Sequence, residues 1–305
     1  MKKSIKRSLK IIAVVVLAVI AINYFDIDDK HYDEYLSQTV SSEQRANAIQ
    51  LNDYERVAGP VKLAEAGDQV SGVTWSPITE SLYVVARGDV VNVLEYDRLG
   101  NFKRRLKSNR NMDAEGITWV DGNTFIIVNE RQQELSAVQI SPETRVVDFN
   151  GVPTFSLAGG NAGNKGLEGI AWNPYDQSAY VVKEKDPIQI FRIQGFLERD
   201  HNRELTVTEQ KVMVQSLNYF NRDLSGIHFD SVSRHFVVLS DESHALSELD
   251  ENGQAVSVMN LEKGWHGLKK TIKQPEGVAM DTEGTVFIVG EPNDLYIFKK
   301  VLLEH

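Results

Sequence analysis

Five similar segments recur along this chain of 305 residues, and they constrain its fold more than any other feature. Each has a glutamate or serine, then a glycine, then a β-branched residue, and two positions later an aromatic residue or methionine. The segments are residues 70–75, 114–119, 167–172, 224–229 and 275–280. Their glycines, Gly72, Gly116, Gly169, Gly226 and Gly277, are 44, 53, 57 and 51 residues apart. A repeat of this length indicates a modular architecture.

Each segment is followed by a turn and then by a short apolar run. These runs are residues 82–86, 125–128, 179–182, 236–239 and 286–289, and a third strand-like run follows, as at 188–193 and 295–298. Strand-sized runs separated by turns, repeated about every 50 residues, are typical of four-stranded propeller blades. We therefore predict an all-β protein, a five-bladed β-propeller. The shared glycines are expected where the innermost strands approach one another most closely.

The last repeat ends near residue 300 and has room for three strands only. An unpaired sheet edge would invite aggregation. Residues 51–63 form a strand-like stretch before the first repeat, and we predict that they supply the outer strand of the fifth blade. A ring closed in this way is one domain, residues 51–303.

The N-terminus has the pattern of an export signal. Residues 1–25 carry five basic residues and no acidic one, with an uninterrupted apolar run at 11–22. Three interpretations remain open: an uncleaved signal anchor or transmembrane helix, a cleaved signal, and a buried core helix. Because the bases precede the apolar run, the rest of the chain is expected outside the cytoplasm. Residues 26–50 are predicted to be a linker, a stalk or a short helix.

Beyond residue 25 the chain has 28 basic and 43 acidic residues, a net charge of −15. Such a domain repels phosphate backbones, so we expect no nucleic-acid partner. It suits cations or a basic protein instead. The chain has no cysteine, which excludes disulfides, thiolate metal sites and a cysteine nucleophile.

Several stretches resemble the SdiA-regulated (YjiK-like) family of Gram-negative bacteria. They are IKQPEGVAMDTEGTVFIVGEPN at 272–293, GLEGIAW at 166–172, VKEKDP at 182–187 and SDES at 240–243. The resemblance covers about residues 51–298 and the basic and apolar N-terminus. It implies a five-bladed propeller distantly related to NHL-repeat propellers, with a proposed calcium site. The N-terminal pattern adds the expectation of a single-pass protein of the inner membrane with its propeller in the periplasm, and cleaved export to the periplasm is the alternative. The family has no established activity.

The repeats place carboxylates at equivalent positions. Glu115, Glu168 and Glu276 precede the shared glycine, and Glu130, Glu184, Glu242 and Glu291 follow the second strand. Residues at one blade position converge on a common axis, where several carboxylates repel unless a cation or protons lie among them. Calcium takes six to eight oxygen ligands in a flexible shell, so it is the expected cofactor. The alternative is a purely structural ring of carboxylates that accept backbone hydrogen bonds.

Two functions follow from these observations. The first is a membrane-anchored, periplasm-facing binding or scaffold module, with calcium as a structural or ligand-bridging ion and an unknown ligand or protein as partner. The second is a metal-dependent hydrolase of lactonase or esterase type with its site at the axis, for which His228 is a candidate base. The second rests on fold analogy.

Overall fold

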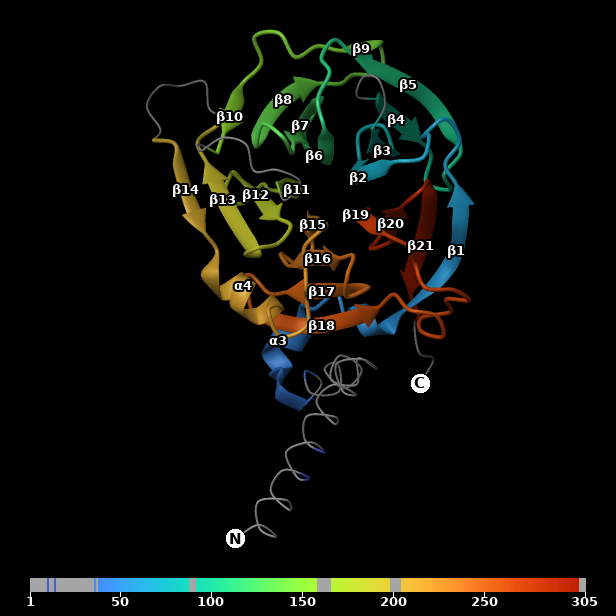
Figure 1. The fold of residues 1–305 in the computed structure, drawn as a ribbon, viewed down its shortest axis with the longest axis vertical. Helices are drawn as coiled ribbons and strands as arrows, with labels where there is room; N and C mark the ends of the chain where they lie inside the picture. Colours follow the sequence, from blue (N-terminus) through green and yellow to red (C-terminus); the bar gives the residue numbers. More distant parts are fainter. Residues whose placement is uncertain are drawn as a thin grey trace.

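A computed structural model describes residues 38–87, 92–157, 166–197 and 204–301, together with Lys10, Val14 and Leu36. In this part of the chain the strands form five sheets arranged around a common centre (Figure 1). The predicted five-bladed β-propeller is confirmed. The described residues contain no helix that is long and apolar enough to cross a membrane. The predicted anchor lies outside them, apart from Lys10 and Val14.

Each blade is an antiparallel meander that runs outward from the centre. Blade one comprises β2 (Val70–Ser76), β3 (Ser81–Ala86), β4 (Asn92–Tyr96) and β5 (Phe102–Ser108), with β9 (Val146–Val147) paired in parallel to β5. Blade two comprises β6 (Ala114–Asp121), β7 (Thr124–Asn129), β8 (Glu134–Gln139) and β10 (Thr154–Ser156). Blade three comprises β11 (Leu167–Asn173), β12 (Ser178–Lys183), β13 (Gln189–Gln194) and β14 (Thr206–Glu209). Blade four comprises β15 (Gly226–Phe229), β16 (Phe236–Ser240), β17 (Ala245–Leu249) and β18 (Ala255–Asn260), and α4 (Lys211–Leu217) precedes it.

Blade five closes the ring as predicted. Its strands β19 (Pro275–Met280), β20 (Val286–Gly290) and β21 (Asp294–Lys300) come from the end of the chain, and β1 (Tyr54–Lys62) comes from its beginning. The pairing runs antiparallel from Tyr54 opposite Lys300 to Lys62 opposite Asp294. The outer strand of the last blade therefore comes from the opposite end of the chain, which leaves blade five with a complete sheet.

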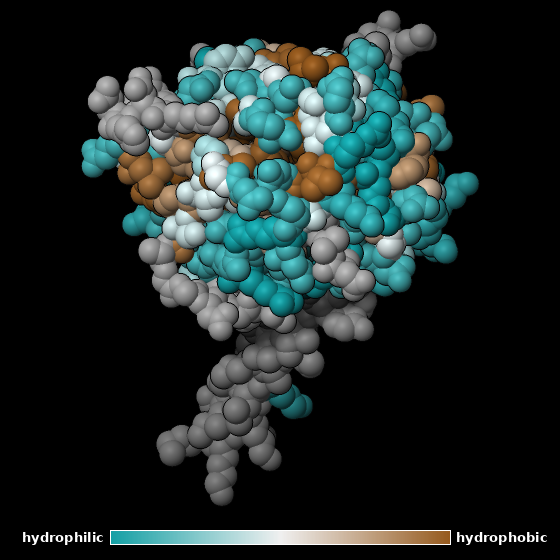
Figure 2. Space-filling view, turned by 90° about the horizontal axis from the view of Figure 1, so that it is seen from above, coloured by the Kyte–Doolittle hydropathy of each residue, from teal (hydrophilic) through white to brown (hydrophobic). Residues whose placement is uncertain are grey.

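Alternation along the strands fills the spaces between blades. In β3, Leu82 and Val84 pack toward blade five, whereas Tyr83 and Val85 pack toward blade two. Five hydrophobic clusters of this kind each join two consecutive blades. Period-two burial on both faces explains why the central strands are almost continuously apolar. The side of the molecule seen in Figure 2 is mostly hydrophilic, with its hydrophobic residues in separate patches.

The shared glycines lie where the inner strands meet. A Cβ atom placed on Gly72 would lie 2.8 Å from the carbonyl oxygen of Glu115, and one on Gly277 would lie 2.9 Å from that of Ser71. Gly116, Gly169 and Gly226 likewise face the backbone of the next blade. At Gly72, Gly116, Gly169 and Gly277 a Cβ would lie under 3.0 Å from the neighbouring backbone, so a larger residue would push the blades apart, whereas the contact at Gly226 is looser, at 3.4 Å from the carbonyl oxygen of Glu276.

The segment before β1 is held against blade four. It contains α3 (Ser42–Ala46) and a short 3-10 turn, η1 (Leu51–Asp53). The fully buried carboxylate of Glu248 in β17 accepts hydrogen bonds from the backbone N–H groups of Ile49 at 2.6 Å and Gln50 at 3.0 Å. This contact fixes the path by which the chain enters the propeller.

Candidate metal centre at the propeller axis

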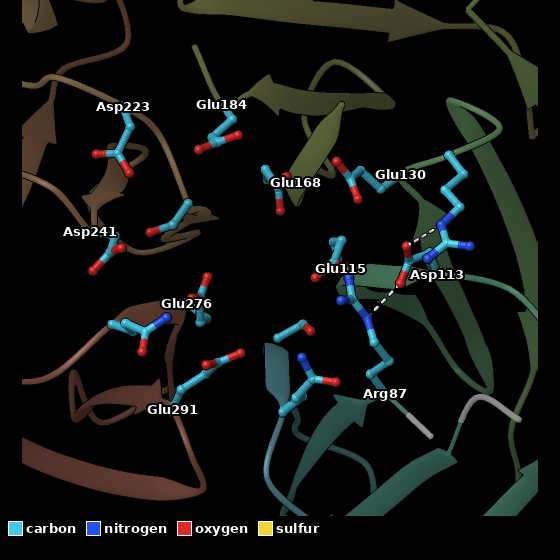
Figure 3. A pocket seen from close by; sticks show the side chains of 15 residues that line it. Arg87, Asp113, Glu115, Glu130, Glu168, Glu184, Asp223, Asp241, Glu276 and Glu291 are labelled. Atoms are coloured by element: carbon cyan, nitrogen blue, oxygen red, sulfur yellow. Dashed lines mark hydrogen bonds and ion pairs between the residues drawn. The ribbon is translucent and has the colours of Figure 1, made fainter. Parts of the chain in front are cut away.

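A cavity of about 340 Å³ lies at the centre of the ring and receives side chains from all five blades (Figure 3). We call it the axial cavity. It is lined by Gln69, Ser71, Arg87, Asp113, Glu115, Glu130, Arg131, Glu168, Glu184, Asp223, Ser225, Asp241, Gln274, Glu276 and Glu291. Nine of these residues have carboxyl groups and two have guanidinium groups. The cavity is therefore strongly acidic.

The fold places these side chains at three equivalent positions in each blade. The first ring stands directly before the shared glycine and consists of Ser71, Glu115, Glu168, Ser225 and Glu276. The second ring directly follows the second strand and consists of Arg87, Glu130, Glu184, Asp241 and Glu291. The third position lies two residues before the first ring and holds Gln69, Asp113, Gly166, Asp223 and Gln274.

Backbone hydrogen bonds establish that the second-ring residues of blades one, two, three and five are equivalent. The N–H groups of Glu130 and Glu291 donate to the carbonyl oxygens at the third position of their own blades, at 2.9 Å and 3.0 Å. The N–H of Glu184 does the same at 3.3 Å, and that of Arg87 at 2.9 Å. Arg87 is thus the blade-one counterpart of these glutamates.

Six of the seven predicted glutamates line the axial cavity: Glu115, Glu168, Glu276, Glu130, Glu184 and Glu291. The seventh, Glu242, is not among the residues that line it. Because β16 ends at Ser240, Asp241 takes the second-ring position and Glu242 falls one residue beyond. The side chain of Glu242 is 44 % exposed and its carboxylate lies 2.8 Å from the Lys185 ammonium. The prediction of Glu242 as an axial residue is therefore replaced by Asp241.

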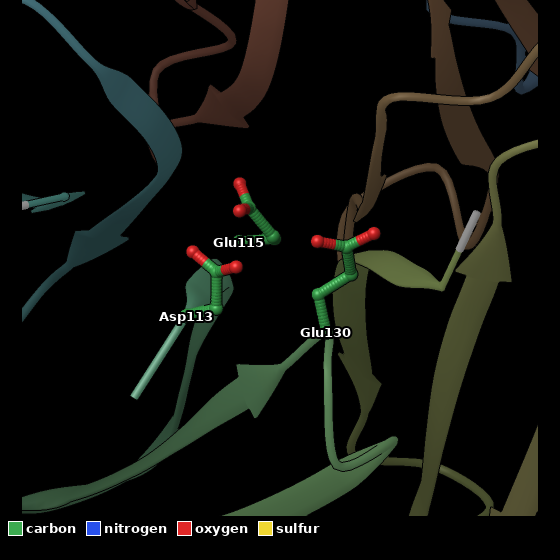
Figure 4. A group of neighbouring side chains, drawn as sticks. All are labelled: Asp113, Glu115 and Glu130. Carbon is green, nitrogen blue, oxygen red and sulfur yellow. The ribbon is translucent and has the colours of Figure 1, made fainter. Parts of the chain in front are cut away.

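Asp113 is an axial residue that sequence reasoning did not identify. One oxygen each from Asp113, Glu115 and Glu130 lies within 4.8 Å of the others (Figure 4), and all three residues are buried. Asp113 comes just before β6 rather than within a strand. The signal that points to it is Asp223, which occupies the same position in blade four. Oxygen atoms this close together suit a single hard cation.

Arginine partly compensates this charge. Arg87 places Nε 2.6 Å from an Asp113 oxygen and Nη2 2.5 Å from a Glu115 oxygen. Arg131 places Nε 2.7 Å from the other Asp113 oxygen. Both guanidinium groups therefore bind the acidic triad of blade two. Seven of the nine axial carboxyl groups have no ion pair to either arginine among the described residues.

The electrostatic cost of this arrangement appears in the pKa values. Burial raises the pKa of Glu115 to about 6, with Ser71 and Arg87 opposing the change. Burial, together with Asp241 and other nearby carboxylates, raises the pKa of Glu276 to about 9. The pKa of Glu168 is raised well above its ordinary value by burial and by four neighbouring carboxylates. Several axial carboxyl groups therefore bind protons near neutral pH when no other cation is present.

A second cavity of about 360 Å³ adjoins the first, and we call it the side cavity. It is lined by Arg87, Asn111, Met112, Asp113, Asn129, Arg131 and Gln132, so it shares both arginines and Asp113 with the axial cavity. Asn129 is 1 % exposed. Its Nδ2 donates to Gln132 at 2.8 Å, but its Oδ1 has no hydrogen-bond partner in the described part of the chain.

The donor set fits the cofactor expected from the sequence. The triad and its neighbours present carboxylate oxygens, with neutral amide and hydroxyl oxygens close by, and calcium prefers ligands of these kinds. The acidic residues that would hold it are Asp113, Glu115 and Glu130. His228 is not among the residues lining the axial cavity, so it does not supply a base there.

Solved structures with the same fold are distant in sequence. The glutaminyl cyclase of Myxococcus xanthus matches with a TM-score of 0.53 and 13 % identity, covering 81 % of this chain and 95 % of that one. A Bacteroides thetaiotaomicron protein of unknown function matches with a TM-score of 0.50 and 11 % identity, covering 80 % and 72 %. A gluconolactonase of Xanthomonas campestris matches with a TM-score of 0.45 and 13 % identity, covering 80 % and 96 %. These likenesses concern the fold alone.

The family comparison agrees with the resemblance noted in the sequence. The model of the family described as SdiA-regulated matches residues 46–299, which is nearly the whole of the propeller. The chain therefore belongs to the SdiA-regulated family.

Proposed function

We propose that this protein is a calcium-binding propeller that recognises a ligand or partner at its axial cavity, with the ion bound between the protein and that ligand. The observation that carries the proposal is the set of nine carboxyl groups in one cavity with only two arginines. The close triad Asp113, Glu115 and Glu130 supplies the first ligands.

A bound cation is the physical alternative to protonation. Carboxylates that share a small, partly dry cavity repel one another, and the repulsion is relieved by protons or by a metal ion. The raised pKa values of Glu115 and Glu276 describe the protonated case. A divalent ion neutralises two charges at once and frees protons on binding, which favours it as pH rises. When bound, it would offer positive charge to an oxygen atom of an incoming ligand.

Calorimetric titration of the full-length protein with calcium and with magnesium tests this proposal. Calcium should release or absorb heat and raise the melting temperature, and the double variant Glu115→Gln, Glu130→Gln should lose both responses. Glu283→Gln is the matched control, because Glu283 lies at an exposed turn of blade five with Arg98 as its partner. No heat and no thermal shift at millimolar calcium would refute the calcium proposal.

We also propose that residues 1–25 hold the propeller on the periplasmic side of the inner membrane. The support is the group of five bases before an apolar run without a charged residue. Protease treatment of intact cells and of spheroplasts tests this location. Degradation only after the outer membrane is opened is expected, with the protein in the membrane fraction. Release in soluble form would indicate cleavage instead, and protection in spheroplasts would refute export.

A metal-dependent hydrolase is the second candidate. The observation in its favour is that Glu115 and Asp241, both lining the axial cavity, have pKa values raised by burial to about 6, which suits proton transfer near neutral pH. Hydrolysis of simple lactones and esters, measured with calcium and with a chelator, tests it. Turnover that calcium restores after chelation would support the enzyme, and none would leave the binding function.

A further inference from the structure

Arg87 breaks an otherwise acidic ring. At the second-ring position the other four blades have Glu130, Glu184, Asp241 and Glu291, whereas blade one has arginine. The backbone at Arg87 is held as in blades two, three and five, by the hydrogen bond from its N–H to the carbonyl oxygen of Gln69 at 2.9 Å. The exchange therefore concerns only the side chain, and it reverses the charge at one fifth of the ring.

The guanidinium of Arg87 binds the same groups that a cation would use. Its Nε and Nη2 atoms lie 2.6 Å and 2.5 Å from oxygens of Asp113 and Glu115, and Figure 3 shows the three side chains at the cavity. Asp113 and Glu115 are two of the three members of the close triad. An ion and a guanidinium cannot both occupy this space, because like charges at such distances repel strongly. A cation at the oxygens that Arg87 now contacts would therefore compete with the Arg87 ion pairs at Asp113 and Glu115.

The structure also offers Arg87 a second position. Its side chain lines the axial cavity and the side cavity alike. Asn129 lines the side cavity, and its Oδ1 atom is buried behind that wall with no hydrogen-bond partner among the described residues. A buried acceptor left unpaired is costly, and a guanidinium N–H is a donor that would satisfy it. The side cavity is large enough, at about 360 Å³, to receive the end of the arginine side chain.

We propose that Arg87 is a built-in competitor for the cation site, which swings from Asp113 and Glu115 to Asn129 when a divalent ion binds. The inference rests on the proposed calcium function and names the residue that sets its affinity. The protein binds the ion only at the expense of two ion pairs, so the measured affinity is lower than that of the carboxylates alone. Arg87 of blade one thereby lowers the cation affinity of a site whose ligands belong to blade two.

Calorimetric titration with calcium of the full-length protein and of its Arg87 variants tests the proposal. Arg87→Gln should bind calcium about tenfold more tightly than the wild type, since the competing charge is gone. Arg87→Lys should lie between them, because an ammonium group cannot bridge both carboxylates in the bidentate manner of arginine. Arg98→Gln is the matched control, since Arg98 has a similar exposure and bridges Asp281 and Glu283 away from the axial cavity.

A double-mutant cycle tests the second position. Asn129→Leu should weaken calcium binding in the wild-type background and have no effect in the Arg87→Gln background, because no guanidinium then needs a partner. An equal loss in both backgrounds would overturn the swing and make Asn129 a direct ligand. Melting curves with and without calcium show that each variant is folded.

The outcomes separate the two proposals. Calcium binding by the wild type with equal or weaker binding by Arg87→Gln would overturn the competitor role and leave the calcium function intact. Binding by neither protein would refute both. Binding by Arg87→Gln alone would support the competitor role and show that Arg87 masks the site in the wild type.

Discussion

Replacing Glu276 by glutamine tests whether the axial carboxylates strain the cation-free protein. Glu276 directly precedes Gly277 in β19 and lines the axial cavity. Burial and the charges of Asp241, Glu291 and Glu115 raise its pKa to about 9. Glutamine keeps the shape of the side chain and removes the ionisable group, so it separates packing from charge.

The size of the effect follows from proton linkage. The folded protein holds a proton on Glu276 between pH 4.5 and about 9, whereas the unfolded chain does not. Folding must therefore take up a proton across this range, and stability falls as pH rises. At pH 7 the cost is about 3 kcal/mol, and at pH 5 it is under about 1 kcal/mol. The variant escapes this cost, so Glu276→Gln should be more stable than the wild type at pH 7 and nearly equal to it at pH 5.

Urea denaturation at pH 5, 7 and 8.5, in the presence of a chelator, measures the difference. Saturating calcium should reduce or reverse the advantage of the variant, because the wild type gains more binding energy. Glu283→Gln serves as the control, since Arg98 lowers the pKa of the exposed Glu283 and its removal should bring no gain at pH 7. A Glu276→Gln variant that is less stable than the wild type, or whose gain does not change with pH, would refute the reasoning.

Three further predictions concern the fold and the site. Glu248→Ala should lower the free energy of unfolding, measured by urea denaturation, by about 3–5 kcal/mol, because it leaves the backbone N–H groups of Ile49 and Gln50 without their acceptor. A loss below about 1 kcal/mol would be inconsistent with this buried contact. Gly72→Ala should lower the free energy of unfolding by about 1–3 kcal/mol, and with it the melting temperature, since the new Cβ would lie 2.8 Å from the carbonyl oxygen of Glu115. An unchanged melting temperature would contradict the tight packing of the inner strands. The apparent calcium affinity should rise between pH 5 and pH 8 as protons leave the axial carboxyl groups, and calorimetry that finds it independent of pH would contradict the shared site.

The architecture was predictable because its signals are local and repeated. The glycine of the innermost strand, the turn after that strand and the apolar run beyond it recur five times. An ambiguous assignment in one blade is therefore resolved by the other four. The closing strand followed from counting strands: blade five lacked one, and residues 51–63 had no other place. Glu130, Glu184 and Glu291 were found because each directly follows a second strand.

The axial residues that the sequence did not predict are those that no repeated pattern identifies. Asp241 and Glu242 are adjacent acids, and only the pairing of Gly226 with Leu239 shows which one faces the axis. Asp113 precedes its strand and has an acidic counterpart in a single other blade, so its repetition is too weak to detect. Arg87 could not be predicted from repetition, because it departs from the acidic residues that the other four blades share at its position.

The charged groups of the axial cavity are not distributed evenly over the five blades. Blade two contributes three axial carboxyl groups, whereas blades three, four and five contribute two each and blade one contributes none. Both arginines of the cavity also lie against blade two, since Arg87 and Arg131 each form an ion pair with Asp113. Blade two therefore combines the closest carboxyl oxygens of the cavity with both of its guanidinium groups, so its geometry suits an ion while its charge is partly offset. If a divalent ion binds there, as we propose, its affinity depends on how readily Arg87 gives up Asp113 and Glu115. On the proposal made above, the arginine in blade one keeps the affinity of a cation site in blade two moderate.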